Sequence, residues 1–349
     1  MNSIVQNAST PPGAVLAGDA EPILRVNNLR TVFYTRSGTV PAVDDLSFEV
    51  RRGETLGLVG ESGCGKSVTS LSILRLIPPR AGTIEHGSVM YAGRDLMKLG
   101  DEEMRQIRGG DIAMVFQEPM TALNPVLTIG QQIVETILLH ENMSKEEARN
   151  RAIEMLRTVH ISEAERQIDN YPHQLSGGMR QRAMIAMALS CNPKVLIADE
   201  PTTALDVTIQ AQILELMQEL QAKFGTAIIM ITHDLGVIAE TADRVAVMYA
   251  GRKVEEADVQ DLFDDPVHPY TQGLLQAIPG MDFDDPNAPR RRLYAIEGTV
   301  PALSDLPPGC SFAPRCPLAS DICRSEVPPL EQKKPRHWAA CWNSPQPPR

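Results

Sequence analysis

A glycine-rich segment at residues 60–67 constrains the fold of this chain more than any other feature. It follows the pattern GxxxxGK[ST], comes directly after the apolar run Thr55–Val59 and precedes a helical stretch. Glycines allow a backbone to wrap a phosphate with its N–H groups, and the following helix adds positive potential from its N-terminus. The pattern predicts a nucleotide-binding strand–loop–helix unit. Its residues are Gly60, Glu61, Ser62, Gly63, Cys64, Gly65, Lys66 and Ser67.

A second apolar run, Lys194–Ala198, ends in the two carboxylates Asp199 and Glu200. Carboxylates at a strand end beside a phosphate-binding loop suit metal-assisted phosphoryl chemistry. We expect Asp199 and Ser67 to hold Mg²⁺ and Glu200 to activate water, while Lys66 contacts the β- and γ-phosphate oxygens. The sequence therefore predicts an ATP-hydrolysing enzyme that uses ATP and Mg²⁺.

A further glycine-rich segment, residues 175–181, precedes the helical run Met179–Ser190. It predicts a second phosphate cradle at a helix N-terminus. One chain cannot sensibly use two such cradles on one phosphate.

The rest of the main domain alternates strand-like and helical patterns, which predicts an α/β fold. The strand-like runs are residues 55–59, 112–116, 195–198, 227–231 and 244–249. Between Glu118 and His173 we find no strong strand, and Ser144 with Glu147 forms a capping box that predicts a helix through about His160. We therefore expect a flexible tail at residues 1–22, an ATPase domain at 23–278 with a helical subdomain inserted at about 118–178, and a C-terminal module at 279–349.

From about Phe33 to about Arg252 these landmarks resemble the ABC-type ATPases in both kind and order. The resemblance implies a nucleotide-sandwich dimer in which Ser176 and Gly178 face the γ-phosphate bound by the opposite subunit. The residues of this trans-acting signature would be Leu175, Ser176, Gly177, Gly178 and Gln181.

The same resemblance assigns roles to several isolated residues. Gln117 corresponds to the Q-loop glutamine, which senses Mg²⁺ together with Ser67 and Asp199 and couples to the membrane partner. Asp206 in the sequence Ala204-Leu205-Asp206 matches the D-loop, and His233 matches the switch histidine that contacts the γ-phosphate. The aromatic residue that stacks on adenine is either Phe33 or Tyr34.

The last 71 residues contain 14 of the 27 prolines and four of the six cysteines, which marks a change of composition after Pro279. Cysteine pairs seldom form disulfides in the cytosol, so metal ligation is favoured, but the spacing alone does not distinguish zinc from an iron–sulfur cluster. The candidate ligands are Cys310, Cys316, Cys323 and Cys341.

Three segments of this region, residues 268–271, 298–301 and 308–317, resemble the C-terminal module of oligopeptide and dipeptide importer ATPases. That family implies a 4Fe-4S cluster on the four cysteines, which we expect to be structural. Cys64 and Cys191 are expected to be bystanders, although the position of Cys64 near a helix N-terminus predicts sensitivity to alkylation.

The net charge of −11 argues against nucleic acid as a partner. The sequence contains neither an apolar stretch of the roughly 18 residues that span a bilayer nor a signal peptide, so we expect a cytosolic chain. The family resemblance implies that it attaches through permease subunits to the cytoplasmic face of the inner membrane. The resemblance implies a paralogous ATPase, two permeases and an extracytoplasmic binding protein as partners. Nickel, glutathione or another small solute is an alternative cargo to peptides. A non-transport ABC ATPase is a further alternative, but the tandem domains or basic face typical of that class are absent from the sequence.

Overall fold

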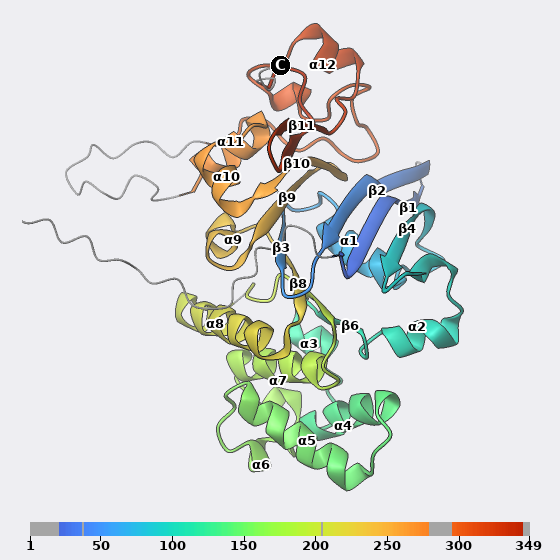
Figure 1. The fold of residues 1–349 in the computed structure, drawn as a ribbon, viewed down its shortest axis with the longest axis vertical. Helices are drawn as coiled ribbons and strands as arrows, with labels where there is room; N and C mark the ends of the chain where they lie inside the picture. Colours follow the sequence, from blue (N-terminus) through green and yellow to red (C-terminus); the bar gives the residue numbers. More distant parts are fainter. Residues whose placement is uncertain (1–20, 37, 204, 279–294, 345–349) are drawn as a thin grey trace, which may run out of the picture.

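The computed structural model describes residues 21–36, 38–203, 205–278 and 295–344. Most of the expected N-terminal tail, Ala204 of the expected D-loop and the first part of the expected C-terminal module lie outside these ranges. The described chain forms an eight-stranded sheet, a four-stranded sheet and surrounding helices. Figure 1 shows the helices of residues 119–189 at one end of the molecule and the C-terminal residues at the opposite end.

Parallel strands form one side of the eight-stranded sheet, in the order β9-β3-β8-β7-β6. Nearly every residue in them is buried, as expected for apolar strands that are covered on both faces. The five strand-like runs of the sequence are confirmed to within one residue. The strands are β3 (Thr55–Val59), β6 (Ile112–Val115), β7 (Val195–Asp199), β8 (Ala227–Thr232) and β9 (Arg244–Tyr249).

Antiparallel strands extend this sheet beyond β9: β10 (Arg252–Asp258), then β12 (His337–Ala339), then β11 (Glu331–Lys334). Two of them belong to the C-terminal residues, which pair with the ATPase domain through Glu255↔Ala339 and Glu256↔Trp338. Strands β11 and β12 of the expected C-terminal module therefore complete the main sheet. The outermost strand, β11, has the polar sequence EQKK.

The four-stranded antiparallel sheet has the order β2-β1-β4-β5. It lies beside the main sheet and covers a second cluster of buried apolar residues that includes Leu24, Leu46 and Leu58. The sequence analysis did not identify this sheet. Its strands are β1 (Leu24–Thr35), β2 (Gly38–Val50), β4 (Gly82–Tyr91) and β5 (Arg94–Asp95).

Helices dominate residues 119–189, where no strand occurs among the described residues. Capping boxes open two of them: Thr128 with Gln131, and Ser144 with Glu147 as expected from the sequence. These elements are α3 (Pro119–Ala122), α4 (Ile129–His140), α5 (Lys145–Thr158), α6 (Ala164–Gln167), η2 (Pro172–Gln174) and α7 (Gly177–Leu189).

The remaining helices flank the sheets or lie near the C-terminus (Figure 1). They are α1 (Lys66–Ile73), η1 (Leu96–Lys98), α2 (Asp101–Ile107), α8 (Val207–Phe224), α9 (Leu235–Thr241), α10 (Val259–Asp264), α11 (Pro269–Gln276), η3 (Ala313–Arg315) and α12 (Asp321–Ser325). None of the helices in the described part of the chain combines the length and apolarity that a membrane span requires.

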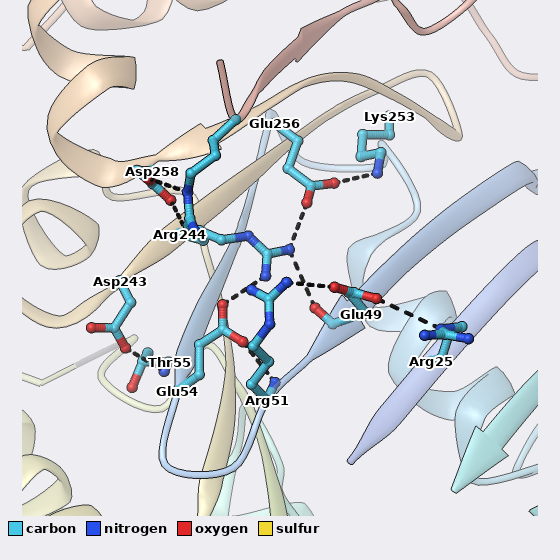
Figure 2. A network of polar contacts seen from close by, with 11 residues as sticks. Arg25, Glu49, Arg51, Glu54, Thr55, Asp243, Arg244, Lys253, Glu256 and Asp258 are labelled. Atoms are coloured by element: carbon cyan, nitrogen blue, oxygen red, sulfur yellow. Dashed lines mark hydrogen bonds and ion pairs between the residues drawn. The ribbon is translucent and has the colours of Figure 1, made fainter. Parts of the chain in front are cut away.

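A buried ion-pair network centred on Arg244 links the two sheets (Figure 2). Its guanidinium donates to Glu54 at 2.7 Å and to Glu256 at 2.6 Å, and Glu256 also pairs with Lys253. Arg244 also donates to the backbone oxygen of Glu49 at the end of β2. This network joins the β2–β3 turn to β9 and β10. Removal of one partner would be strongly destabilising, because it would leave another charge buried and unpaired.

Candidate nucleotide site

Four parallel strands bring the predicted catalytic residues to one edge of the main sheet. In the strand register, Val59 lies opposite Thr232, Asp199 opposite Ile231 and Val115 opposite Ala198, so β3, β8, β7 and β6 end at similar levels. The residues that follow these strands therefore meet at the carboxyl edge, where ligands bind in open α/β sheets.

The phosphate-binding loop closes around the ammonium group of Lys66. This side chain is buried, and its Nζ donates to the backbone oxygens of Gly60 at 2.6 Å and Glu61 at 3.2 Å. Gly60 and Gly65 have φ angles of 154° and 104°, and a Cβ at either position would lie within 2.3 Å of a backbone oxygen. Only glycine fits at these two positions, as the sequence pattern requires.

The Ser67 hydroxyl donates to Asp199 Oδ1 at 3.0 Å, so these two predicted Mg²⁺ ligands touch. Burial raises the pKa of the Asp199 carboxyl, although the hydrogen bond from Ser67 opposes this shift. The third predicted ligand, Gln117, instead donates to Glu200. The structure thus places Gln117 with the proposed base rather than with the Ser67–Asp199 pair.

Glu200 is the centre of the site. Its carboxylate accepts from Gln117 Nε2 at 2.8 Å and from the Thr203 hydroxyl at 2.9 Å, and His233 Nδ1 lies 3.2 Å from its other oxygen. Burial acts to raise the pKa of Glu200, but the hydrogen bonds from Thr203 and His233 outweigh it and hold the pKa below its ordinary value. The group is therefore ionised at neutral pH and able to accept a proton.

Thr203 is a site residue that the sequence analysis missed. It lies three residues after Glu200, and its backbone N–H donates to the Glu200 carbonyl at 3.2 Å, which closes a turn. A hydroxyl residue one turn after a catalytic carboxylate was the signal that could have identified it.

The predicted signature residues lie at the start of α7. Ser176 caps this helix by accepting from the Met179 N–H at 3.3 Å, and Gly178 packs so closely that a Cβ would lie 3.0 Å from Ile209. Leu175 and Gln181 are buried, with 4% and 1% of their surface exposed. Both side chains therefore face the interior of this chain, whereas Ser176 is exposed and Gly177 and Gly178 are half-buried.

Asp206, Phe33 and Tyr34 are the remaining predicted site residues. Asp206 caps α8 by accepting from the Ile209 N–H at 3.0 Å. Phe33 is half-buried at the end of β1, whereas Tyr34 is 53% exposed. An exposed ring is available for stacking, so the structure favours Tyr34 over Phe33 as an adenine contact.

Comparisons with known proteins agree with this geometry. Residues 43–203 match the ABC transporter family, and residues 254–323 match the family described as "Oligopeptide/dipeptide transporter, C-terminal region". The chain is 55% identical to the oligopeptide transport ATP-binding protein AppD of Bacillus subtilis over 92% of this chain and 96% of that protein. It is 49% identical to the oligopeptide transport ATP-binding protein OppD of Escherichia coli over 97% of this chain and 98% of that protein.

This chain belongs to the ABC transporter ATP-binding subunits. Among solved structures, the dimeric ATP-binding cassette MJ0796, in a post-hydrolysis state with ADP and Pi, matches with a TM-score of 0.61 and 29% identity over 68% of this chain and 98% of that chain. The chain is therefore an ATP-hydrolysing subunit with the ABC ATPase fold.

Four cysteines of this ABC ATPase, Cys310, Cys316, Cys323 and Cys341, line one small pocket. All six cysteines of the chain lie in the described ranges and are free thiols. Burial raises the pKa of Cys310 to about 11. Within the described residues, no group of three or more His, Cys, Asp or Glu side chains is arranged so that it could hold a metal ion.

Two further side chains of the ABC ATPase, those of His268 and Cys64, are buried. His268 forms a local hydrogen bond, in which its Nδ1 accepts from the Tyr270 N–H at 3.1 Å. Cys64 was expected to be sensitive to alkylation, but only 1% of its surface is exposed and burial raises its pKa. That expectation is wrong, because burial outweighs the effects of the helix N-terminus and the neighbouring Lys66.

Proposed function

We propose that this ABC ATPase powers the uptake of di- or oligopeptides across the cytoplasmic membrane. The observation that carries the proposal is the 49–55% identity to AppD and OppD, which extends beyond the ATPase core into the C-terminal residues. Nickel, glutathione or another small solute is the alternative cargo, because an ATPase subunit does not contact the substrate itself.

The hydrolytic roles follow from the contacts at the carboxyl edge. Lys66 would leave the Gly60 and Glu61 oxygens to neutralise the β- and γ-phosphates, and Ser67 with Asp199 would hold Mg²⁺, which neutralises charge on the phosphates. Glu200 accepts the proton of the attacking water, while Gln117 and His233 orient its two oxygens. Tyr34 offers its exposed ring to adenine.

The starts of α7 and α8 suit a second role in a dimer. Ser176, Gly177 and Gly178 present atoms at the surface, and among the described residues no hydrogen bond joins them to the phosphate-binding loop of the same chain. They would complete the nucleotide site of an opposing subunit, and Asp206 would lie at the same interface between the two subunits. A related ATPase is the expected partner, and ATP-driven closure would alternate with opening after hydrolysis.

The remaining partners are two permeases and an extracytoplasmic binding protein, with the ATPase attached peripherally at the cytoplasmic face of the inner membrane. In this arrangement, residues 118–178 form a helical subdomain of the ATPase domain (23–278), and Gln117, immediately before it, relays the state of Glu200 to the permeases. Residues 279–349 form the C-terminal module.

The four cysteines around one pocket would hold a 4Fe-4S cluster, with zinc as the alternative metal. Four free thiols supply the kind and number of ligands that either group requires, but they would have to move closer together, because their arrangement in the described residues does not itself form a metal site. Anaerobically purified protein should contain about four iron and four sulfide per chain. Protein with one equivalent of zinc and no iron would support the alternative, and protein with neither would refute both.

The test of the transport function is ATP hydrolysis by the chain reconstituted with the permeases and binding protein encoded beside it. Addition of di- or oligopeptides with the binding protein should stimulate hydrolysis. Stimulation by nickel or glutathione alone would favour the alternative cargo. High activity that is unaffected by any membrane partner would contradict a transport role.

A further inference from the structure

A buried arginine from the C-terminal residues holds the phosphate-binding loop of the ATPase domain. Arg315 lies in η3, between Cys310 and Cys316, and only 4% of its side chain is exposed. Its guanidinium binds both carboxylate oxygens of Glu61, with Nη1–Oε2 at 2.7 Å and Nη2–Oε1 at 3.1 Å. Paired contacts of this kind are stronger and more directional than a single ion pair.

Every N–H group of this guanidinium has an acceptor. Besides Glu61, Nε donates to the Glu297 carbonyl at 3.1 Å, Nη2 to the Ile296 carbonyl at 3.3 Å and Nη1 to the Tyr249 hydroxyl at 3.4 Å. An arginine has five such donors, and all of them are used here. Lysine, with a single ammonium group, cannot reproduce this set of contacts.

Glu61 is held from a second side by α11. Its backbone N–H donates to the hydroxyl of Tyr270 at 2.9 Å, and Tyr270 is fully buried. The Glu61 carbonyl in turn accepts from Lys66 Nζ at 3.2 Å. The side chain, N–H and carbonyl of Glu61 therefore all form hydrogen bonds. Two of these contacts come from Arg315 and Tyr270, which lie beyond the ABC ATPase core.

We propose that Arg315 is a positioning residue for ATP binding, which acts through Glu61 to hold the phosphate-binding loop in its binding conformation before the nucleotide arrives. A loop already held in its binding conformation loses less conformational entropy when it wraps the phosphates. Loss of Arg315 frees the loop and leaves Glu61, an anion next to the phosphates, without a counter-charge. This inference rests on the assignment of residues 60–67 as the nucleotide site.

The experiment measures binding of a fluorescent ATP analogue with Mg²⁺, and the KM and kcat of ATP hydrolysis, in the full-length chain. Arg315→Ala should raise both the dissociation constant and the KM at least fivefold, while kcat changes less than twofold. Arg315→Lys should recover only part of the affinity. In Glu61→Ala/Arg315→Ala the second substitution should add little to the first, because both remove one interaction.

The matched control is Arg336→Ala. Arg336 also joins the C-terminal residues to the ATPase domain by a paired contact, in which Nε and Nη2 bind Asp258 at 2.7 and 2.8 Å, but it does not contact the loop. Its loss should leave the KM unchanged. A general effect of loosening the C-terminus would instead change both variants alike and would overturn the proposal.

Tyr270→Phe provides a second route if Arg315→Ala does not fold. It removes only the hydroxyl that accepts from the Glu61 N–H, so it should raise the KM by a smaller factor in folded protein. Unchanged ATP affinity in folded Arg315→Ala, or in Tyr270→Phe if the alanine variant is unfolded, would overturn the proposal. Undiminished ATP binding by Lys66→Ala would instead refute the nucleotide site itself.

Discussion

The carboxyl edge of the main sheet and the C-terminal residues are built in opposite ways. At the edge, short loops that follow buried strands place Lys66, Glu200 and His233 directly, so neighbours in the sequence decide the geometry. The C-terminal residues are positioned by residues that are far away in the sequence, because β12 pairs with β10 and Phe312 packs against Tyr249 and Tyr270. Changes in the first region should therefore alter chemistry, and changes in the second, apart from Arg315, should alter stability.

Glu200→Gln tests the first half of this comparison and should have the largest effect. Glutamine keeps the shape of the side chain but cannot accept the proton of water, so kcat should fall by about 10²- to 10⁴-fold. ATP binding should persist and the closed dimer should accumulate, as measured by steady-state hydrolysis and size-exclusion chromatography with ATP. The control, Glu215→Gln, changes an exposed carboxylate on α8. Near-normal turnover by Glu200→Gln would contradict the assigned base.

Phe312→Ala tests the second half. Its ring is 2% exposed and lies 5.2 Å from the ring of Tyr249 and 5.4 Å from that of Tyr270, measured between centroids. Truncation should reduce the free energy of unfolding by about 3–5 kcal/mol, measured by urea denaturation. Leu318→Ala, at a side chain that is 53% exposed, should change it by less than about 0.5 kcal/mol. Equal effects of the two variants would show that Phe312 does not anchor this region.

The pH dependence of stability sharpens the comparison, because the buried His268 lies where the C-terminal residues meet the ATPase domain. Burial lowers the pKa of His268 to about 4, although the nearby charge of Glu255 opposes the shift. The unfolded chain binds this proton near pH 6.5, so the free energy of unfolding should fall by about 3 kcal/mol as the pH drops from 6.5 to 4. His268→Asn keeps an acceptor for the Tyr270 N–H and should flatten this slope. His173→Asn, at an exposed site, should retain it.

Thr203→Val should have the smallest effect. The Thr203 hydroxyl helps to hold the pKa of Glu200 below its ordinary value. Its loss should raise that pKa, so the acid limb of the pH profile of kcat should move to higher pH while activity at neutral pH changes little. Thr208→Val, on the exposed start of α8, is the control. An unmoved acid limb would show that this hydrogen bond does not tune the base.

The sequence predicted best those elements whose signals are local. Continuous apolar runs identified the five parallel strands, and a capping box located the start of α5. The four-stranded sheet was missed, because register shifts on both sides of Leu29 interrupt the alternation of β1. Strand β11 was missed as well, because EQKK has no strand pattern and its pairing depends on β12.

Prediction of the nucleotide site was likewise limited to residues that belong to local sequence patterns. The glycine-rich loop, Asp199, Glu200 and His233 were identified from short patterns and lie at one edge of the sheet. Arg315 and Glu61 are 254 positions apart, so no local pattern reveals their contact. The burial of Leu175 and Gln181 was likewise missed, because a family pattern identifies positions without showing which side chains face the interior.

Strand β11 also affects how copies of this chain meet one another. The outer edge of a sheet exposes unpaired N–H and C=O groups, which can add a strand from another molecule. Here that edge carries Glu331, Lys333 and Lys334, and Lys334 is further bound to Asp265. Another strand that docked here would bring charged side chains together and displace this ion pair. Copies of this chain can therefore collide at this edge without joining into a continuous sheet.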